Sequence, residues 1–289
     1  MDNLRGILLL IMAMAAFSIE DAFVKAMSEH VSVAQILIML GIGSSVIFGV
    51  LTWQQGHALF SRVAWQPLCL WRALAEGGAA LTFVTAISLI DLSVLASVFQ
   101  ATPLVVTMGA ALFLGETVGW RRWSAICVGF AGVLLIIRPG LEGFEPIVLI
   151  VLITVVFIAV RDLVTRRIDA NVPSTVVSFQ GFAALIFAGA LLLIFTDQGV
   201  VSLTSQLWWM LLGGVIFGAL GYYGIVVSMR IADASAIMPF RYTRLLFTLL
   251  IAMIVFGERP DLLTLFGGSI VIASGFYTYV RERRLSQSN

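Results

Sequence analysis

The stretch PFRYTRLLFTLLIAMIVFGE, from Pro239 to Glu258, contains the two features on which the fold depends. Up to Phe256 its only charged residues are Arg241 and Arg244, and a helix of about 20 mostly apolar residues can cross the hydrocarbon core of a bilayer. The stretch also ends in Gly-Glu, a pair that recurs earlier in the chain. It therefore predicts a membrane-spanning helix, and it raises the question of why such a helix carries two arginines.

The composition of the whole chain supports a membrane location. Of its 289 residues, 60% are hydrophobic and 11% are charged, and the mean hydropathy is +1.05. A soluble domain is about half apolar and about a quarter charged. So much apolar surface cannot be hidden inside a globule with a polar skin, so the sequence predicts an integral membrane protein. The net charge of +1 gives no indication of nucleic-acid binding.

Ten apolar windows of sufficient length follow one another along the chain, and we predict an all-α polytopic membrane protein with ten transmembrane helices. The first window is longer than the apolar core of a signal peptide and ends in Glu20 and Asp21, so we interpret it as a helix that is not cleaved. The windows lie near 4–26, 33–53, 68–90, 93–114, 121–138, 145–166, 174–195, 206–229, 234–256 and 261–280.

Basic residues are distributed unequally between the two sides that this topology defines. Most arginines fall on the side of the two termini, whereas Lys25, Arg138 and Arg259 fall on the other side. Cytoplasmic loops of membrane proteins are enriched in Lys and Arg. We therefore expect a multi-pass protein of a bacterial-type inner membrane with both termini in the cytoplasm, where residues 281–289 form a tail.

The two halves of the chain repeat each other. Leu114-Gly115-Glu116 closes the fourth window as Phe256-Gly257-Glu258 closes the ninth, and the acid-to-base spacing of Asp21 to Lys25 recurs from Asp162 to Arg166. Two successive units of five helices enter the membrane in opposite directions, because five is odd. We therefore predict two inverted repeats with a substrate site between them near the middle of the membrane, as in many secondary transporters.

Two longer stretches resemble a known family. LFLGETVGWRRWSAICVGFAGVLLIIRPG, from Leu112 to Gly140, and IVFGERPDLLTLFGGSIVIASG, from Ile254 to Gly275, are similar to the Gly-Glu signatures of EamA-type transporters in the drug/metabolite transporter superfamily. The openings AFSIEDAFVKAM and FRYTRLLF also resemble its riboflavin and S-adenosylmethionine carrier branch. The resemblance implies a ten-helix carrier with a central cavity between EamA-like repeats at 1–141 and 142–280.

The two arginines of the ninth window are the first candidates for substrate binding. A charge near mid-membrane is expensive, and Arg241 and Arg244 share one helix face. Their guanidinium groups suit carboxylate, phosphate or imide groups, and Tyr242 adds a ring for stacking. The alternative is a structural ion pair with an acid on another helix, for which Glu76 is our candidate. Glu76 can instead pair with Arg72, four residues earlier on its own helix.

Other polar residues in the spans are weaker candidates. Gln100 occupies roughly the repeat-equivalent position of Tyr242, and Tyr223 lies among the glycines of the eighth window. Two acid-containing pairs in opposite halves are the candidates for gating or proton coupling. A carboxyl removed from water holds a proton more readily, which suits proton coupling. Alternatively, the two pairs sit in wet vestibules and only pair with Lys25 and Arg166. These pairs are Glu20 with Asp21, and Arg161 with Asp162. Glu116 and Glu258 are expected to fix loops by accepting backbone hydrogen bonds.

The function predicted from these features is secondary transport of a small polar metabolite by alternating access. Riboflavin or a related vitamin or nucleoside-like compound is one candidate substrate, and export of an amino acid, drug or other metabolite is the alternative. An intramembrane lipid-modifying enzyme would need a cluster of His, Asp or Ser at one membrane face. A non-transporting scaffold would have no use for buried charges in both repeats. We expect no cofactor and no metal, no nucleic-acid partner, and a monomer or homodimer in the lipid bilayer.

Overall fold

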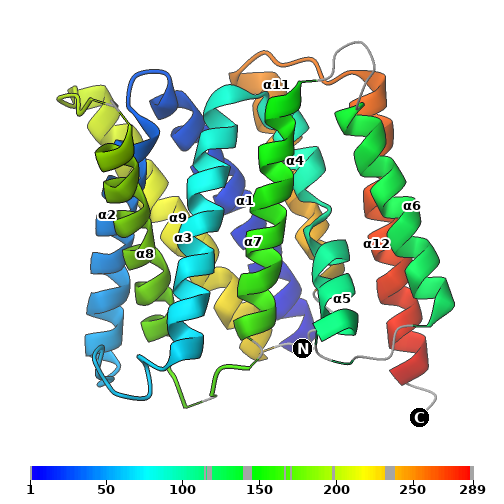
Figure 1. Ribbon diagram of the computed structural model, residues 1–289, viewed down its shortest axis with the longest axis horizontal. Helices are drawn as coiled ribbons and strands as arrows, with labels where there is room; N and C mark the ends of the chain where they lie inside the picture. The colour runs from blue at the N-terminus through cyan, green and yellow to red at the C-terminus, as the bar shows by residue number, and fades with distance from the viewer. Residues whose placement is uncertain are drawn as a thin grey trace.

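The computed structural model describes residues 2–113, 115, 119–138, 145–165, 167–169, 171–196, 199–231 and 238–286. Within these ranges the chain is helical and contains no strand. The helices run side by side in alternating directions, and the start of α1 and the end of α12 lie at the same end of the bundle (Figure 1). We call this end the terminal end.

The helices of the first half begin and end close to the predicted windows. They are α1 (Asp2–Ser28), α2 (Val33–Gln54), α3 (Pro67–Leu89), α4 (Leu92–Phe99), α5 (Thr102–Phe113) and α6 (Trp120–Ile137). Those of the second half are α7 (Leu149–Thr165), α8 (Ser174–Phe195), α9 (Ser205–Ile231), α11 (Thr243–Val255) and α12 (Leu262–Ser286), with the 3-10 helices η1 (Pro146–Val148) and η2 (Met238–Tyr242).

Six segments of the described chain are long and apolar enough to cross a membrane. They are Leu4–Ser28, Val33–Gln54, Leu92–Phe113, Pro146–Thr165, Ser174–Phe195 and Ser205–Ile225, with shorter apolar helices at Trp123–Ile137 and Leu262–Tyr277. Large side chains such as Phe187, Ile194 and Ile254 are exposed on the outside of the bundle, where lipid would cover them. Helices suit these surroundings because they pair their backbone polar groups internally.

The fourth and ninth spans are not continuous helices, and here the expected windows 93–114 and 234–256 need correction. The fourth span breaks between α4 and α5 because Pro103 has no N–H to donate to the Phe99 carbonyl. The Oγ1 of Thr102 donates to that carbonyl instead, at 2.7 Å. In the ninth, the 3-10 turn η2 precedes α11. Irregular backbone at membrane depth is tolerated where protein buries it or where it lines a cavity.

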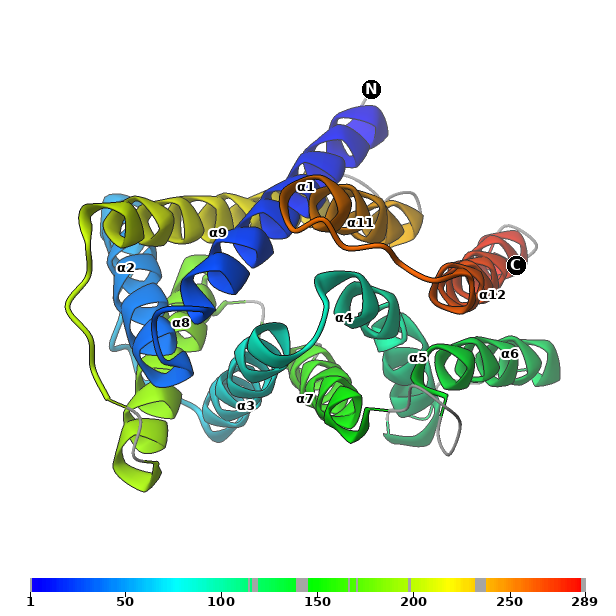
Figure 2. The ribbon, with the colours of Figure 1, turned by 90° about the horizontal axis from the view of Figure 1, so that it is seen from above.

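The two halves pack mainly against each other. α1 packs on α9 and α11, as α7 packs on α3 and α5. α2 pairs with α8 at one edge of the bundle, and α6 pairs with α12 at the other (Figure 2). The glycines of the two Gly-Glu pairs, Gly115 and Gly257, both have a left-handed φ, of 69° and 65°. Glycine adopts this conformation without steric penalty, which explains the repeated choice of residue.

Candidate functional site

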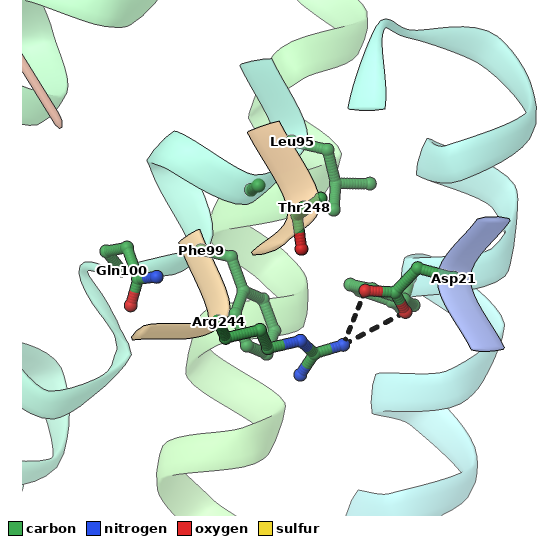
Figure 3. Close-up of a pocket in the computed structure, with 8 residues that line it drawn as sticks. Asp21, Leu95, Phe99, Gln100, Arg244 and Thr248 are labelled. Atoms are coloured by element: carbon green, nitrogen blue, oxygen red, sulfur yellow. Dashed lines mark hydrogen bonds and ion pairs between the residues drawn. The ribbon is translucent and has the colours of Figure 1, made fainter. Parts of the chain in front are cut away.

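Arg244 forms a buried ion pair with Asp21. Arg244 lies in the first turn of α11, and its Nη2 is 3.0 Å and 2.9 Å from the two carboxylate oxygens of Asp21 on α1. The two side chains are 17% and 5% exposed. Figure 3 shows the guanidinium group reaching across to Asp21, with Gln100 on its other side. The pair joins one helix of each half.

Three aromatic rings surround the same guanidinium group. The Cζ of Arg244 is 5.1 Å from the ring centroid of Phe17, 5.7 Å from that of Phe83 and 4.9 Å from that of Phe99. These rings belong to α1, α3 and α4, and all lie within the distance of about 6 Å at which a cation is attracted to a ring face. We call Asp21, Arg244 and the three phenylalanines the caged ion pair.

Hydroxyl groups fix α11 to α1 beside this cage. The Oγ of Ser18 lies 2.8 Å from the Oγ1 of Thr248 and 3.2 Å from the carbonyl oxygen of Arg244. Ser18 lies about one helical turn before Asp21 on α1, so the contacts hold the acid and the arginine at one level. The backbone of Arg244 is therefore positioned as well as its side chain.

A small cavity adjoins the caged ion pair. Its volume is about 10 Å³, roughly what one ordered water needs. This cavity by itself is too small for a metabolite. Its lining comes from α1, α3, α4, α11 and the break after α4, and consists of Asp21, Phe83, Leu95, Ala96, Phe99, Gln100, Arg244 and Thr248.

A second cluster of charges lies nearer the terminal end and centres on Glu76. One carboxylate oxygen of Glu76 is 2.8 Å from Nη1 of Arg161, and the other is 3.0 Å from Nη2 of Arg72. Arg161 also donates from Nε to Asp162 at 2.9 Å. We call Arg72, Glu76, Arg161 and Asp162 the Glu76 network, and it joins α3 to α7.

Arg72 extends the Glu76 network to two further helices. Its Nη1 donates to the carbonyl of Val177 on α8 at 3.1 Å, its Nε donates to Thr165 at 3.3 Å, and its Nη2 donates to the hydroxyl of Tyr222 on α9. The ring of Tyr222 packs edge-on against Phe48 and Phe182. Nearly every donor of this arginine is thus used inside the protein.

Arg241 differs from the other arginines of the site. It lies in the η2 turn, and within the described residues it makes no hydrogen bond or salt bridge. Asp162 is the acid within electrostatic range, while Arg161 and Arg244 are like charges that act against it. Within the part of the chain that the structure describes, Arg241 therefore has donors without a hydrogen-bond partner.

The arginine partners differ from the expected ones. Glu76 was the candidate acid for Arg241 or Arg244 under the alternative of a structural ion pair. It pairs instead with Arg72 on its own helix, the other possibility that the sequence left open, and with Arg161. The acid of Arg244 is Asp21. The reason is the packing, because α11 lies against α1.

Of the remaining candidates, Gln100 lines the cavity and Glu20 lies within electrostatic range of Asp21 and Arg244, whereas the two tyrosines lie apart from the caged ion pair. The hydroxyl of Tyr242 points at α12, where a Cβ on Gly275 would clash with it. Tyr223 is 46% exposed. Glu20 lies against Gly218 of α9 and, within the described residues, accepts no hydrogen bond.

The end of the bundle opposite the termini is closed by a clasp of Lys25 and Glu258. Lys25 Nζ donates to the carbonyl of Ile90 at 2.7 Å and lies 3.9 Å from Glu258. The Glu258 carboxylate accepts from the backbone N–H groups of Leu92 and Ser93 at 2.8 Å and 2.9 Å. The expected role of Glu258 in fixing a loop is confirmed. Glu116 and Arg166 lie outside the described residues.

The model of the EamA-like transporter family matches residues 4–138 and 145–280, which is nearly the whole chain. The chain belongs to the EamA-like transporter family. This EamA-like protein, of the drug/metabolite transporter superfamily, is a multi-pass protein of the bacterial inner membrane, and the chain spans a little under two thirds of the length of the first curated relatives that it matches. The family and its relatives indicate a transporter and not an enzyme.

The names of relatives of this EamA-like protein mention different substrates. An S-adenosylmethionine uptake transporter of Rickettsia felis is 28% identical over 65% of this chain and 63% of its own length. A riboflavin transporter of Vibrio cholerae is 30% identical over 62% of this chain and 59% of its own length. The pseudopaline exporter CntI of Pseudomonas aeruginosa is 25% identical over 93% of this chain and 94% of its own length.

A solved crystal structure has the same fold. It superposes with a TM-score of 0.68 at 19% sequence identity, and the match covers 97% of this chain and 98% of the other. At this identity the likeness concerns the fold alone.

The three cage phenylalanines were not predicted from the sequence. The charged residues stand out in apolar helices, whereas Phe83 and Phe99 are two of 20 phenylalanines. One signal was available, since Phe17 precedes Asp21 by four residues and so shares its helix face.

Proposed function

We propose that this EamA-like transporter carries a small polar metabolite by alternating access between two inverted five-helix repeats. The observation that carries the proposal is the caged ion pair, which joins a helix of each half at a cavity beside two irregular helices. Discontinuous helices at the interface of two repeats are where secondary transporters bind substrate. We place the repeats at 1–141 and 142–280, in keeping with the two family matches.

The packing pattern supports the inverted repeat. A two-fold axis in the membrane plane exchanges the first helix of one repeat with the first helix of the other. Under it, the packing of α1 on α9 and α11 becomes that of α7 on α3 and α5, and the pairs of α2 with α8 and of α6 with α12 map onto themselves. With the terminal end in the cytoplasm, the basic loops lie on the side that the positive-inside rule favours.

The charged clusters suggest gates at the two ends. The Lys25–Glu258 clasp holds α1, α4 and the end of α11 together, and the Glu76 network holds α3, α7, α8 and α9. With both in place and a small cavity beside the caged ion pair, we assign the conformation to an occluded step of the cycle. Opening toward the cytoplasm would then require Arg161 to separate from Glu76.

The substrate that we propose is a polar metabolite of the kind its relatives carry. The names of those relatives give S-adenosylmethionine, riboflavin and pseudopaline as their substrates. Arg241, whose donors have no partner among the described residues, and Arg244 are the groups that would bind a carboxylate, phosphate or imide. Tyr242, Tyr223 and Gln100 are further candidates. Riboflavin uptake and amino-acid or drug export are both in keeping with these residues.

The test is transport by purified protein in liposomes, with labelled S-adenosylmethionine, riboflavin and amino acids. We expect Arg241→Ala and Arg244→Ala to abolish flux of the transported compound. Arg138→Ala is the control, because Arg138 pairs with Asp261 at the opposite end. Equal losses in all three variants, or none, would count against the assigned site.

Proton coupling is tested separately. Glu20 and Asp21 are the candidate carriers, and Glu20 is the freer of the two because Arg244 holds Asp21. We expect Glu20→Gln to flatten the dependence of uptake on an imposed pH gradient while binding persists. An unaltered gradient dependence in both Glu20→Gln and Asp21→Asn would remove both residues as carriers.

A further inference from the structure

The caged ion pair has the composition of a binding site for an organic cation. Asp21 supplies the opposite charge, and Phe17, Phe83 and Phe99 present rings 4.9 to 5.7 Å from the Cζ of Arg244. Asp21 alone neutralises the charge, so an ion pair as such needs no ring. Aromatic cages with a cation inside are the arrangement by which proteins recognise ammonium-type ligands.

We infer that Arg244 occupies this cage as a placeholder, and that the positive centre of the substrate takes its position during transport. The inference rests on the proposed function and narrows its substrate class. In the closed conformation the guanidinium group of Arg244 fills the site and leaves room for about one water. In the loaded conformation, the substrate cation binds Asp21 and the rings, and Arg244 turns to the rest of the substrate.

Charge balance determines which charge the rest of the substrate must have. An anion that draws Arg244 away leaves Asp21 unpaired, and a simple cation that takes Asp21 leaves Arg244 unpaired. An unpaired charge between helices is strongly unfavourable. A zwitterion avoids both penalties, because its cation replaces Arg244 beside Asp21 and its carboxylate binds the freed guanidinium group. Arg241 lies within electrostatic range of Arg244, and its donors, which have no hydrogen-bond partner among the described residues, can bind the same carboxylate.

The substrate class is therefore a zwitterion with a compact ammonium or sulfonium centre and a carboxylate. Two pairs of probes test the cation and distinguish its sources. S-adenosylmethionine and S-adenosylhomocysteine differ in the charge on sulfur. Methionine and N-acetylmethionine differ in the charge on nitrogen. Riboflavin is the probe without a cation.

The experiment measures binding of these probes to the purified full-length protein in detergent, followed by flux into liposomes. We expect the charged member of at least one pair to bind about tenfold or more tightly than its uncharged partner. Phe83→Leu and Phe99→Leu keep apolar volume but remove the ring. We expect each to weaken binding of the charged probe about five- to thirtyfold. Phe23→Leu is the control, since Phe23 stacks on Phe217 and belongs to no cation contact of the cage.

The outcomes separate the two proposals. Equal binding within both pairs, or equal effects of the cage variants and Phe23→Leu, would overturn the cation site. Riboflavin transport that depends on Arg244, without binding of either charged probe, would also overturn it but leave the proposed function standing. Failure to bind or transport any of the five probes would overturn both. Melting temperatures of each variant establish that a loss of binding is not a loss of folding.

Discussion

The caged ion pair and the Glu76 network both bury guanidinium and carboxylate groups between helices of the two halves, but they satisfy these groups differently. Arg72 donates to α7, α8 and α9, and Arg161 is shared between Glu76 and Asp162. Within the described residues, the guanidinium group of Arg244 has one ion pair, with Asp21, and three ring faces around it. Ring faces hold any suitable cation, whereas a set of directed hydrogen bonds holds one geometry.

The difference indicates a division of labour. A group with many directed partners resists displacement, because each partner left behind is an unsatisfied buried polar atom. When a substrate cation takes the place of Arg244 in the cage, Asp21 and the rings still have a positive partner. We therefore assign exchange with substrate to the caged ion pair and closure of the terminal end to the Glu76 network. The predictions below test this assignment, beginning with the largest effect.

Arg244→Ala removes the ion-pair partner that Asp21 has in the described chain and should have the largest effect. Breaking one partner of a buried pair costs about 3–5 kcal/mol of stability, and transport should be lost. The double variant Asp21→Asn/Arg244→Gln, without net charge at the site, should regain most of the stability but not the transport. Thermal unfolding in detergent and liposome flux give the two readouts. A double variant as unstable as Arg244→Ala would show that charge balance does not govern this site.

Glu76→Gln should destabilise the protein less than Arg244→Ala. Arg161 keeps Asp162 and Arg72 keeps its bonds to Val177 and Tyr222, so the expected loss is about 1–3 kcal/mol, the cost of one unsatisfied buried group. Substrate binding should survive, because the caged ion pair is intact. Melting and binding measured on one preparation check both points. If Glu76→Gln lost substrate binding with an unchanged melting temperature, Glu76 would be assigned to substrate recognition and not to closure of the terminal end.

Gly275→Ala tests whether the η2 turn positions Arg241. A Cβ at this position would clash with the hydroxyl oxygen of Tyr242, so the ring and the turn that carries it must shift. Overpacking of this kind costs about 1–3 kcal/mol, and substrate affinity should fall with it. Gly268→Ala on the same helix is the control, because its Cβ would meet ordinary contacts at 3.5 Å or more. Identical melting and affinity in the two variants would mean that the turn adapts freely.

The smallest effect concerns Asp261, which caps α12 at the membrane surface. Burial would raise the pKa of its carboxyl, but hydrogen bonds from Arg138 and from the backbone N–H of Thr264 outweigh burial, so the pKa is lowered. A lowered pKa stabilises the fold above the usual pKa of an aspartate, and this contribution is lost as the pH falls through the folded value. Melting of wild type and Asp261→Asn should therefore converge at acidic pH. A difference in melting temperature that stays constant across the pH range would show that Asp261 acts through its hydrogen bond at the start of α12 and not through its charge.

Much of the architecture could be predicted from the sequence because hydrophobicity is a local property. The windows at 33–53 and 174–195 match α2 and α8 within a residue or so. The breaks at the fourth and ninth spans were missed although Pro103 and Pro239 were visible. A proline in an apolar window can kink a helix, end it or be accommodated, and its neighbours decide which.

The residues of the candidate site were visible, but their partnerships were not. The sequence singled out Asp21, Glu76 and Arg244 because charges in apolar helices are rare. It could not pair them, since Asp21 and Arg244 are 223 positions apart and several acids lie at a comparable depth. Choosing among them requires the packing of α1 against α11.

The sequence by itself determined that the chain enters the membrane repeatedly, that its halves repeat and which buried charges need partners. These properties follow from composition and spacing along the chain, which a bilayer acts on segment by segment. The tertiary structure alone decided that Arg244 faces Asp21 inside three phenylalanine rings while Glu76 is surrounded by two other arginines. The reason is that each cluster draws on three or more helices, whose relative rotation and depth are set by packing between the halves and by no single segment.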